Sequence, residues 1–344
     1  MTPALTSRRF SASLAGFALA LSTAAVIALT TGALRVPAGD VLAALGSALR
    51  PTVPVAVDPA SAHVVLFVRA PRLAMAIITG CILGASGAGL QGVFRNPLAD
   101  PGLLGISSGA SLGAALHIVA GGHALGGVGL PLAAFAGGLG AAALAGAFSA
   151  GAGARATGAL VLAGVGVNAA AGAGVGMLAH VATDTQLRDL SFWLLGSLGG
   201  ATWPRLAVAA PVAVTSTLAL LRFGRPLNAL ALGEADAGHL GLEVRTTRAL
   251  LLAVAALGVS ATVAVTGPLG FVGLVVPHTA RMLFGADARR VLPAAALLGA
   301  LLLVLADIAA RTVAAPAEIP TGIVTAAVGA PFFLVLLRAQ RRPA

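Results

Sequence analysis

The sequence contains no lysine and few charged residues of any kind. All 21 basic residues are arginine, and only 9% of the 344 residues are charged. Without lysine, the chain cannot supply the phosphate-binding lysine of a P-loop, a Schiff-base lysine or a lysine general base. Its one cysteine, Cys81, excludes an intrachain disulfide and lies inside an apolar run, where a small packing residue is the simplest interpretation.

What the sequence has instead is apolar residues, which make up 58% of the chain and give a mean hydropathy of +0.99. A soluble protein of this composition would lack a polar surface. A membrane-spanning helix needs roughly 20 apolar residues. We therefore predict an all-α, multi-pass membrane protein with about ten spans. The net charge of +10 does not indicate nucleic-acid binding, because the arginines lie singly or in pairs between apolar runs.

The apolar runs predict individual spans. The run 10–34 follows Arg8 and Arg9 as a secretion signal would, but it is longer than a signal core, and we interpret it as the first span. The piece Ser191–Gly200 is too short to cross and is predicted as a partial helix on the outer side. The ten predicted spans are 10–34, 71–92, 104–120, 128–148, 158–180, 203–221, 249–267, 269–284, 292–310 and 319–337.

Arginine placement predicts the topology. Both termini and a charged island at 222–248 are rich in arginine, and basic residues are commonest in cytoplasmic loops. Six spans precede the island and four follow it, so both termini are predicted to be cytoplasmic. Residues 1–344 are treated as one transmembrane domain that contains this loop. Gly233, Gly238 and Gly241 are expected to permit its turns.

Between the second and third spans, Asn96-Pro97 is predicted to end a helix. Asp100-Pro101 is predicted to start another, with Asp100 as the N-cap and Pro101 at the first helical position. This spacing indicates a tight cytoplasmic hairpin. Farther along, Asp307 and Arg311 are four residues apart and are expected to pair on one helix face.

Several segments together resemble the permease subunits of type II ABC importers for iron-siderophores, haem and vitamin B12. They occur in the family's order over nearly the whole chain, which makes the resemblance more specific than a single glycine motif. The segments are RAPR at 69–72, QGVFRNPLADPG at 91–102, LNALALGE at 227–234, HLGL at 239–242, GFVGLVVPHTAR at 270–281, LADIAAR at 305–311 and EIPTG at 318–322.

The resemblance implies a homodimeric pore in the bacterial inner (cytoplasmic) membrane, with two ATP-binding subunits below it and a periplasmic binding protein above. It implies no cofactor or metal on this chain, because ATP and Mg²⁺ would bind the partner subunits. The implied ATPase-coupling residues are Leu227, Asn228, Leu232, Gly233, Glu234, Gly241 and Leu242. The implied cytoplasmic gate is Asn96, Leu98 and Thr157. Arginines expected at the outer surface, Arg69, Arg72 and Arg311, are implied to dock the binding protein.

Within the family, the segment 183–203 is similar to haem permeases, so haem is the preferred substrate. Ferric siderophore is the alternative, and vitamin B12 is a more distant one. The outer-side histidines are interpreted as interfacial residues rather than iron ligands: His63, His117, His123 and His180. By physics alone, a secondary transporter is the second hypothesis, but no carboxylate or histidine is clearly placed at mid-membrane for ion coupling. An intramembrane enzyme is disfavoured by the absence of HExxH, paired-carboxylate and nucleophile-elbow motifs.

Overall fold

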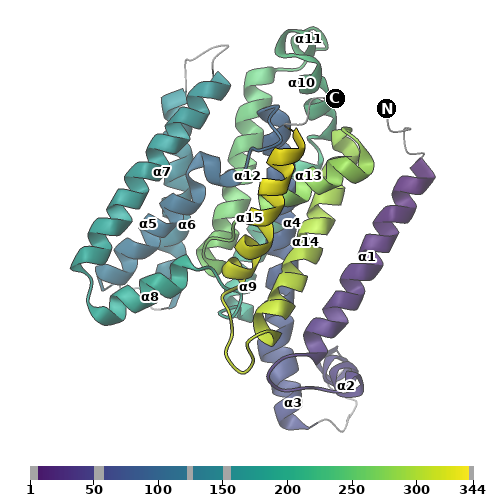
Figure 1. Cartoon of the computed structure of the whole chain (residues 1–344), viewed down its shortest axis with the longest axis vertical. Helices are drawn as coiled ribbons and strands as arrows, with labels where there is room; N and C mark the ends of the chain where they lie inside the picture. The colour runs from purple at the N-terminus through teal and green to yellow at the C-terminus, as the bar shows by residue number, and fades with distance from the viewer. Residues whose placement is uncertain (1–6, 50–57, 122–126, 150–155, 341–344) are drawn as a thin grey trace.

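The computed structural model describes residues 7–49, 58–121, 127–149 and 156–340, and within these ranges all regular structure is helical (Figure 1). The first half comprises α1 (Ser7–Thr30), α2 (Ala38–Leu49), α3 (Pro59–His63), η1 (Val64–Arg69), α4 (Ala70–Val93), η2 (Pro101–Leu104), α5 (Ile106–Val119), α6 (Gly129–Ser149), α7 (Ala156–Val181) and α8 (Asp184–Leu194). The second half comprises α9 (Trp203–Leu221), α10 (Gly224–Leu232), α11 (Glu234–His239), α12 (Val244–Thr266), α13 (Val272–Phe284), α14 (Ala288–Thr312) and α15 (Thr321–Gln340).

The predicted all-α, multi-pass fold is confirmed. Among the described residues, seven helices are long and apolar enough to cross a membrane, and the shorter apolar helices α5, α13 and α15 occupy three further predicted spans. Figure 1 shows the described N-terminal and C-terminal ends of the chain at the same end of the molecule as α10 and α11. This arrangement agrees with an even number of crossings.

The second span begins earlier than predicted. α3, η1 and α4 form one continuous helical run from Pro59 to Val93, instead of a span that starts at residue 71. Pro59 occupies the first helical position, and the Asp58 side chain caps the helix by accepting from the Ser61 N–H at 2.9 Å. Arg69 and Arg72 interrupt the apolar run, so the hydropathy pattern did not show that the helix begins before them. Arg69 and Arg72 therefore lie inside a helix rather than at its end.

The partial outer helix is also displaced from its prediction. The helix is α8, which ends at Leu194, whereas Gly196 adopts a left-handed φ of 65° in a loop. Thr183 and Gln186 form a capping box that starts α8. The polarity of this first turn, rather than an apolar run, marks the helix.

Close packing of α4 against α14 forms the centre of the molecule. A Cβ at Gly80 would lie 2.3 Å from the Gly299 carbonyl oxygen, and one at Gly84 would lie 2.1 Å from that of Ala295. Small residues four apart on both helices let the backbones touch, as is common between helices in lipid. Helices α9, α12 and α13 also pack against α4. The fold thus places α4 in contact with most of the second half of the chain.

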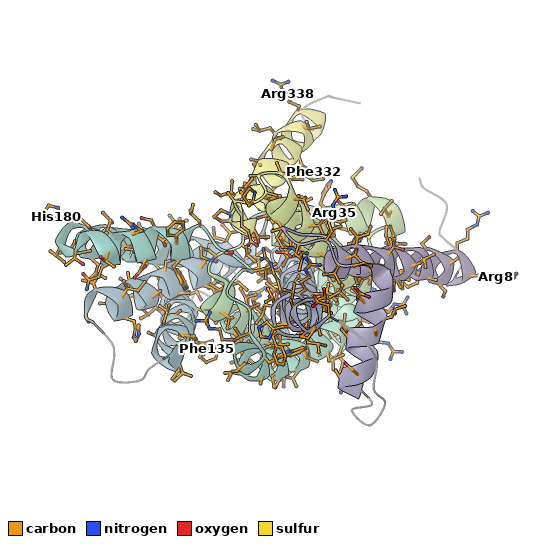
Figure 2. All side chains as sticks on the ribbon, turned by 90° about the horizontal axis from the view of Figure 1, so that it is seen from below. Arg8, Arg35, Phe135, His180, Phe332 and Arg338 are labelled. Carbon is orange, nitrogen blue, oxygen red and sulfur yellow. The ribbon has the colours of Figure 1, made fainter. Side chains whose placement is uncertain are left out.

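Helices α7 and α15 are much less enclosed than α4. Only 17% of the apolar window of α7 is buried, against 72% for the run that contains α4. Figure 2 shows α15, with Phe332 and Arg338, projecting from the body, and His180 of α7 at the far edge. These two helices therefore carry apolar side chains that this chain leaves uncovered.

Candidate coupling, gating and docking sites

The predicted coupling loop consists of two short helices, α10 and α11, separated by Gly233. Leu227 and Leu230 anchor α10, because both are buried against the bundle. On the opposite side, Leu232 and Leu240 are 66% and 67% exposed. The loop therefore presents apolar side chains away from the bundle, as a surface that contacts another subunit would.

Asn228 fixes the position of α10. Its Nδ2 donates to Asp287 at 2.7 Å, and its Oδ1 accepts from the Ala288 N–H at 2.8 Å. Hydrogen bonds from Arg289, Asn228 and the Arg289 backbone hold the pKa of Asp287 well below its usual range. The amide thus joins the coupling helix to the N-terminus of α14. The sequence analysis identified Asn228 but not Asp287. The sequence signal for Asp287 was its position as a possible N-cap just before α14.

Two of the three loop glycines adopt positive φ. Gly233 has φ of 132° and Gly241 has φ of 82°, whereas Gly238 lies inside α11 without such a value. The expectation for Gly238 is therefore wrong, and a helical residue suffices there. Glu234, the first residue of α11, forms an ion pair with Arg248 of α12. Leu242 is half-buried, and its N–H donates to Ala237 O at 3.0 Å.

The predicted hairpin between α4 and α5 is present. Arg95, two residues after the end of α4, has φ of 46°, an uncommon conformation for a residue with a Cβ. The Asn96 side chain accepts from the Leu98 N–H at 2.9 Å, and Asp100 accepts from the Gly102 N–H at 2.8 Å as the predicted N-cap. Burial raises the pKa of Asp100, while that hydrogen bond acts in the opposite direction.

The hairpin predicted to form the gate and the helix α10 predicted to couple to the ATPase meet at one cavity of about 280 Å³. Asn96 lines it from the hairpin, and Leu227 and Asn228 line it from α10. A Cβ at Gly92 would lie 2.9 Å from Leu227 Cδ2, so α10 packs directly on the end of α4. Two predicted sites far apart in sequence are therefore adjacent. Thr157 lies in the first turn of α7, and its side chain is outside the described residues.

The three arginines predicted at the outer surface are buried instead. Arg69, Arg72 and Arg311 are 5%, 4% and 6% exposed. Asp307 accepts from Arg72 Nε at 2.8 Å and lies 3.1 Å from Arg311 Nε, which confirms the predicted Asp307–Arg311 pair. Glu318 accepts from Arg72 Nη1 at 2.8 Å. The expected exposure is wrong because α1 and α14 enclose these side chains.

Two of these arginines cap the C-terminus of α1. Arg69 donates to the carbonyls of Leu29, at 2.6 Å, and Leu34. Arg311 donates to Ala28 O at 3.1 Å and Thr31 O at 3.3 Å. The last carbonyls of a helix lack intrahelical partners, and the negative end of its dipole favours cations. The cluster therefore joins α1, α4 and α14.

The segment that resembles haem permeases makes structural contacts on the same side as this cluster. Gln186 Nε2 donates to Val119 O at 3.2 Å, and Trp203 Nε1 donates to Leu66 O at 2.8 Å. Loop residues after α8 hydrogen-bond to the ends of α12 and α15. These contacts give the polar and aromatic residues of this segment a structural role.

An apolar groove of about 1220 Å³ lies among α5, α6 and α7. Its lining is mostly alanine, glycine and leucine, with His117 as its one imidazole among the described lining residues. No group of three or more His, Cys, Asp or Glu side chains that could hold a metal occurs in the described part of the chain. His123 lies outside the described residues. The groove can accommodate an apolar surface but offers no set of metal ligands.

An all-α fold with several apolar helices long enough to cross a membrane is the fold of a multi-pass membrane protein. The chain belongs to the FecCD transport family, whose model matches residues 19–339. The resemblance noted in the sequence is thereby confirmed. Members of this family are transport subunits of ABC importers, in which separate subunits hydrolyse ATP, so the chain is not an enzyme and the secondary-transporter hypothesis is wrong.

Individual relatives cover most of the chain. The hemin transport system permease HmuU of Yersinia pestis is 44% identical over 289 residues, covering 81% of this chain and 84% of that protein. The cobalamin import permease BtuC of Halobacterium salinarum is 41% identical, covering 81% of this chain and 75% of that one. A solved ABC transporter described as metal-chelate type, in an inward-facing conformation, has a TM-score of 0.83 at 34% identity, covering 96% of this chain and 99% of that one.

Proposed function

We propose that this importer permease translocates haem across the bacterial inner membrane. The observation that carries the proposal is the 44% identity to a hemin permease, together with the haem-type segment at 183–203. The first alternative is a ferric siderophore, and vitamin B12 is the second. Vitamin B12 is included in the test because a cobalamin import permease is 41% identical to this chain.

The substrate is tested by ATP-driven uptake into liposomes that contain the permease with its ATPase and binding protein. Haem, a ferric siderophore and cobalamin are supplied side by side, each with an ATP-free control. Haem uptake above the control is expected, and vesicles with the permease alone should hydrolyse no ATP. Siderophore or cobalamin uptake without haem uptake would refute the haem proposal while leaving the importer class intact. His117→Ala and His180→Ala should retain haem uptake, because neither lies in a set of metal ligands.

We further propose that α10 and α11 contact an ATP-binding subunit. The exposed Leu232 and Leu240 support this, as do the buried anchors Leu227 and Leu230, which hold the loop to the bundle. A force on α10 would reach the gate hairpin through Leu227 and Gly92, which are in contact. In this proposal the loop lies on the cytoplasmic side, and both termini with it. A reporter that becomes fluorescent only in the cytoplasm, fused to the C-terminus, should therefore fluoresce. A fusion that is produced but not fluorescent would contradict this orientation.

The partner at the outer end is proposed to be the periplasmic binding protein. Arg72 is itself buried, so it is proposed to contribute through Glu318 rather than by direct contact with that partner. Its Nη1 donates to Glu318 at 2.8 Å, and the Glu318 side chain is 51% exposed. Arg69 and Arg311 are proposed to contribute through the position of α1, since their donors contact its carbonyls.

A second copy of the chain is the proposed partner for α7. Gly166, Gly172 and Gly176 would each meet nothing within 4 Å of an added Cβ. Small residues on a membrane helix permit close approach of another helix, and this chain supplies none at that face. A homodimer would cover the uncovered faces of α7 and α15 around a shared path.

A further inference from the structure

A second groove, between α6 and α12, has a polar end and an apolar body. Its volume is about 1030 Å³. The polar side chains that line it, apart from Ser149, gather where α12 begins: Glu234, Arg245 and Arg248. The remaining lining residues are alanine, leucine, valine and glycine from α6, α7, α12 and the neighbouring η2. The groove is therefore amphipathic along its length.

The length of the groove corresponds to one leaflet of a bilayer. Along α12 it extends from Arg245 to Leu257, twelve residues, or about 18 Å of helix. Along α6 it extends from Leu139 to Ser149, ten residues, or about 15 Å. Half of a hydrocarbon core of roughly 30 Å is about 15 Å. An acyl chain that starts at the membrane surface would thus reach the midplane at the apolar end of the groove.

The polar end has unused donors for an anion. Arg245 is exposed and has no hydrogen bond or ion pair to any described residue. Arg248 binds Glu234 through Nη2, whereas its Nε is buried and has no hydrogen-bond partner within the described ranges. With two arginines and one glutamate, this end carries a net positive charge. A phosphate at this end could pair with the exposed Arg245 beside the Arg248 guanidinium while Glu234 keeps its own contact.

We propose that the groove binds one anionic phospholipid, with an acyl chain between α6 and α12 and the phosphate at Arg245 and Arg248. A basic pocket between membrane helices at the membrane surface has the chemistry that recognises anionic headgroups. Because Arg248 also holds Glu234, the first residue of α11, the bound phosphate and the coupling loop share one guanidinium. The lipid would therefore stabilise the attachment of α11 to α12.

Two substitutions test the two ends of the groove. Arg245→Gln removes headgroup charge, and Arg225→Gln, an exposed arginine of α10 outside the groove, is its control. Gly146→Leu fills the apolar body, since a Cβ there meets nothing within 4 Å. Gly140→Leu is the control on the same helix, equally open but lining the larger groove.

The measurement is native mass spectrometry of the full chain in mild detergent. The chain is titrated with phosphatidylglycerol or phosphatidylcholine of identical acyl chains. We expect one phosphatidylglycerol per chain, bound in preference to phosphatidylcholine. Arg245→Gln should weaken that binding about fivefold, which corresponds to about 1 kcal/mol for one arginine at the surface. Gly146→Leu should reduce binding of both lipids, and both controls should keep the wild-type preference.

Equal phosphatidylglycerol binding by Arg245→Gln and Arg225→Gln would overturn the headgroup assignment, and with it the proposal. Unchanged lipid binding by Gly146→Leu would overturn it as well. If Gly146→Leu instead lowers the dimer fraction at unchanged lipid content, the groove is an interface between copies and not a lipid site. None of these outcomes depends on the transported substrate.

Discussion

At the scale of single residues, buried arginines are the main departure from expectation. Arg311 contacts Asp307 and two carbonyls at the C-terminal end of α1, those of Ala28 and of Thr31 just after the helix. Arg311→Ala would leave Arg72 as the remaining cationic partner of Asp307. The carbonyls of Ala28 and Thr31 would lose the hydrogen bonds that Arg311 donates. Breaking a buried ion pair costs about 3–5 kcal/mol. We expect a marked loss of thermal stability in detergent, with poor recovery of folded protein.

Arg205→Ala is the control for that measurement, because Arg205 is exposed and donates to Gly200 O, only five residues earlier in the chain. If Arg311→Ala melts like the wild type but no longer binds the binding protein, the structural role is wrong and the docking role is right.

Asp287 gives a pH-dependent prediction. Its folded pKa lies below the unfolded value of about 3.9, so its ionised form stabilises the fold above that value. The contribution is lost as pH falls through the window between the unfolded and folded pKa values. Asp287→Asn should therefore lower stability at pH 7, by no more than about 1 kcal/mol because the site is partly solvated. The deficit relative to wild type should shrink below about pH 4.

Thermal unfolding at pH 7, 5 and 3.5 tests this prediction, with Asp236→Asn, an exposed carboxylate of α11, as the control. A deficit for Asp287→Asn that is constant over this pH range would show that the charge of Asp287 does not stabilise the contact between α10 and α14.

At the scale of elements, the coupling loop depends on its two left-handed glycines. Gly241 has φ of 82° with open space around it. The added methyl group of Gly241→Ala would therefore clash with no neighbour, and its cost would be backbone strain only. A residue with a Cβ in the left-handed region costs about 1–2 kcal/mol. Gly238→Ala is the matched substitution, equally open but helical, and should be neutral or slightly stabilising.

Faster amide exchange over 234–242 and weaker stimulation of the ATPase are expected for Gly241→Ala and not for Gly238→Ala. The exchange readout reports the loop itself, and the ATPase readout reports coupling. Wild-type ATPase stimulation in a variant with a loosened loop would refute the assignment of α10 and α11 as the coupling element.

At the scale of the whole molecule, the open face of α7 predicts where two copies meet. A single cysteine at Gly172, in a Cys81→Ala background, should cross-link the chain to a second copy in membranes. Gly16→Cys on α1 is the control, since that position is also exposed and open. Figure 1 places α1 and α7 at opposite edges of the molecule. Cross-linking through residue 16 but not through 172 would place the dimer interface elsewhere.

The sequence by itself determined the class of fold, the number of predicted spans and the main motifs. Apolar runs and arginine placement are local properties, and a bilayer imposes a helix length that makes them readable. Asp100 and Pro101 predicted a helix start correctly, because N-capping is also a local property that involves neighbouring residues only. The pair Asp307–Arg311 followed from the helical repeat alone.

The tertiary structure decided what each polar residue contacts. Nothing near Arg69 in the sequence indicates that the end of α1, about 40 residues earlier, supplies its acceptors. Likewise, Asn228 reaches Asp287 across 59 residues, and Asn96 shares a cavity with α10. A buried arginine and an exposed one look alike in a sequence. Which arginine is buried depends on how helices that are distant along the chain pack together, and glycines such as Gly84 allow that packing to be close. A buried arginine must then be paired.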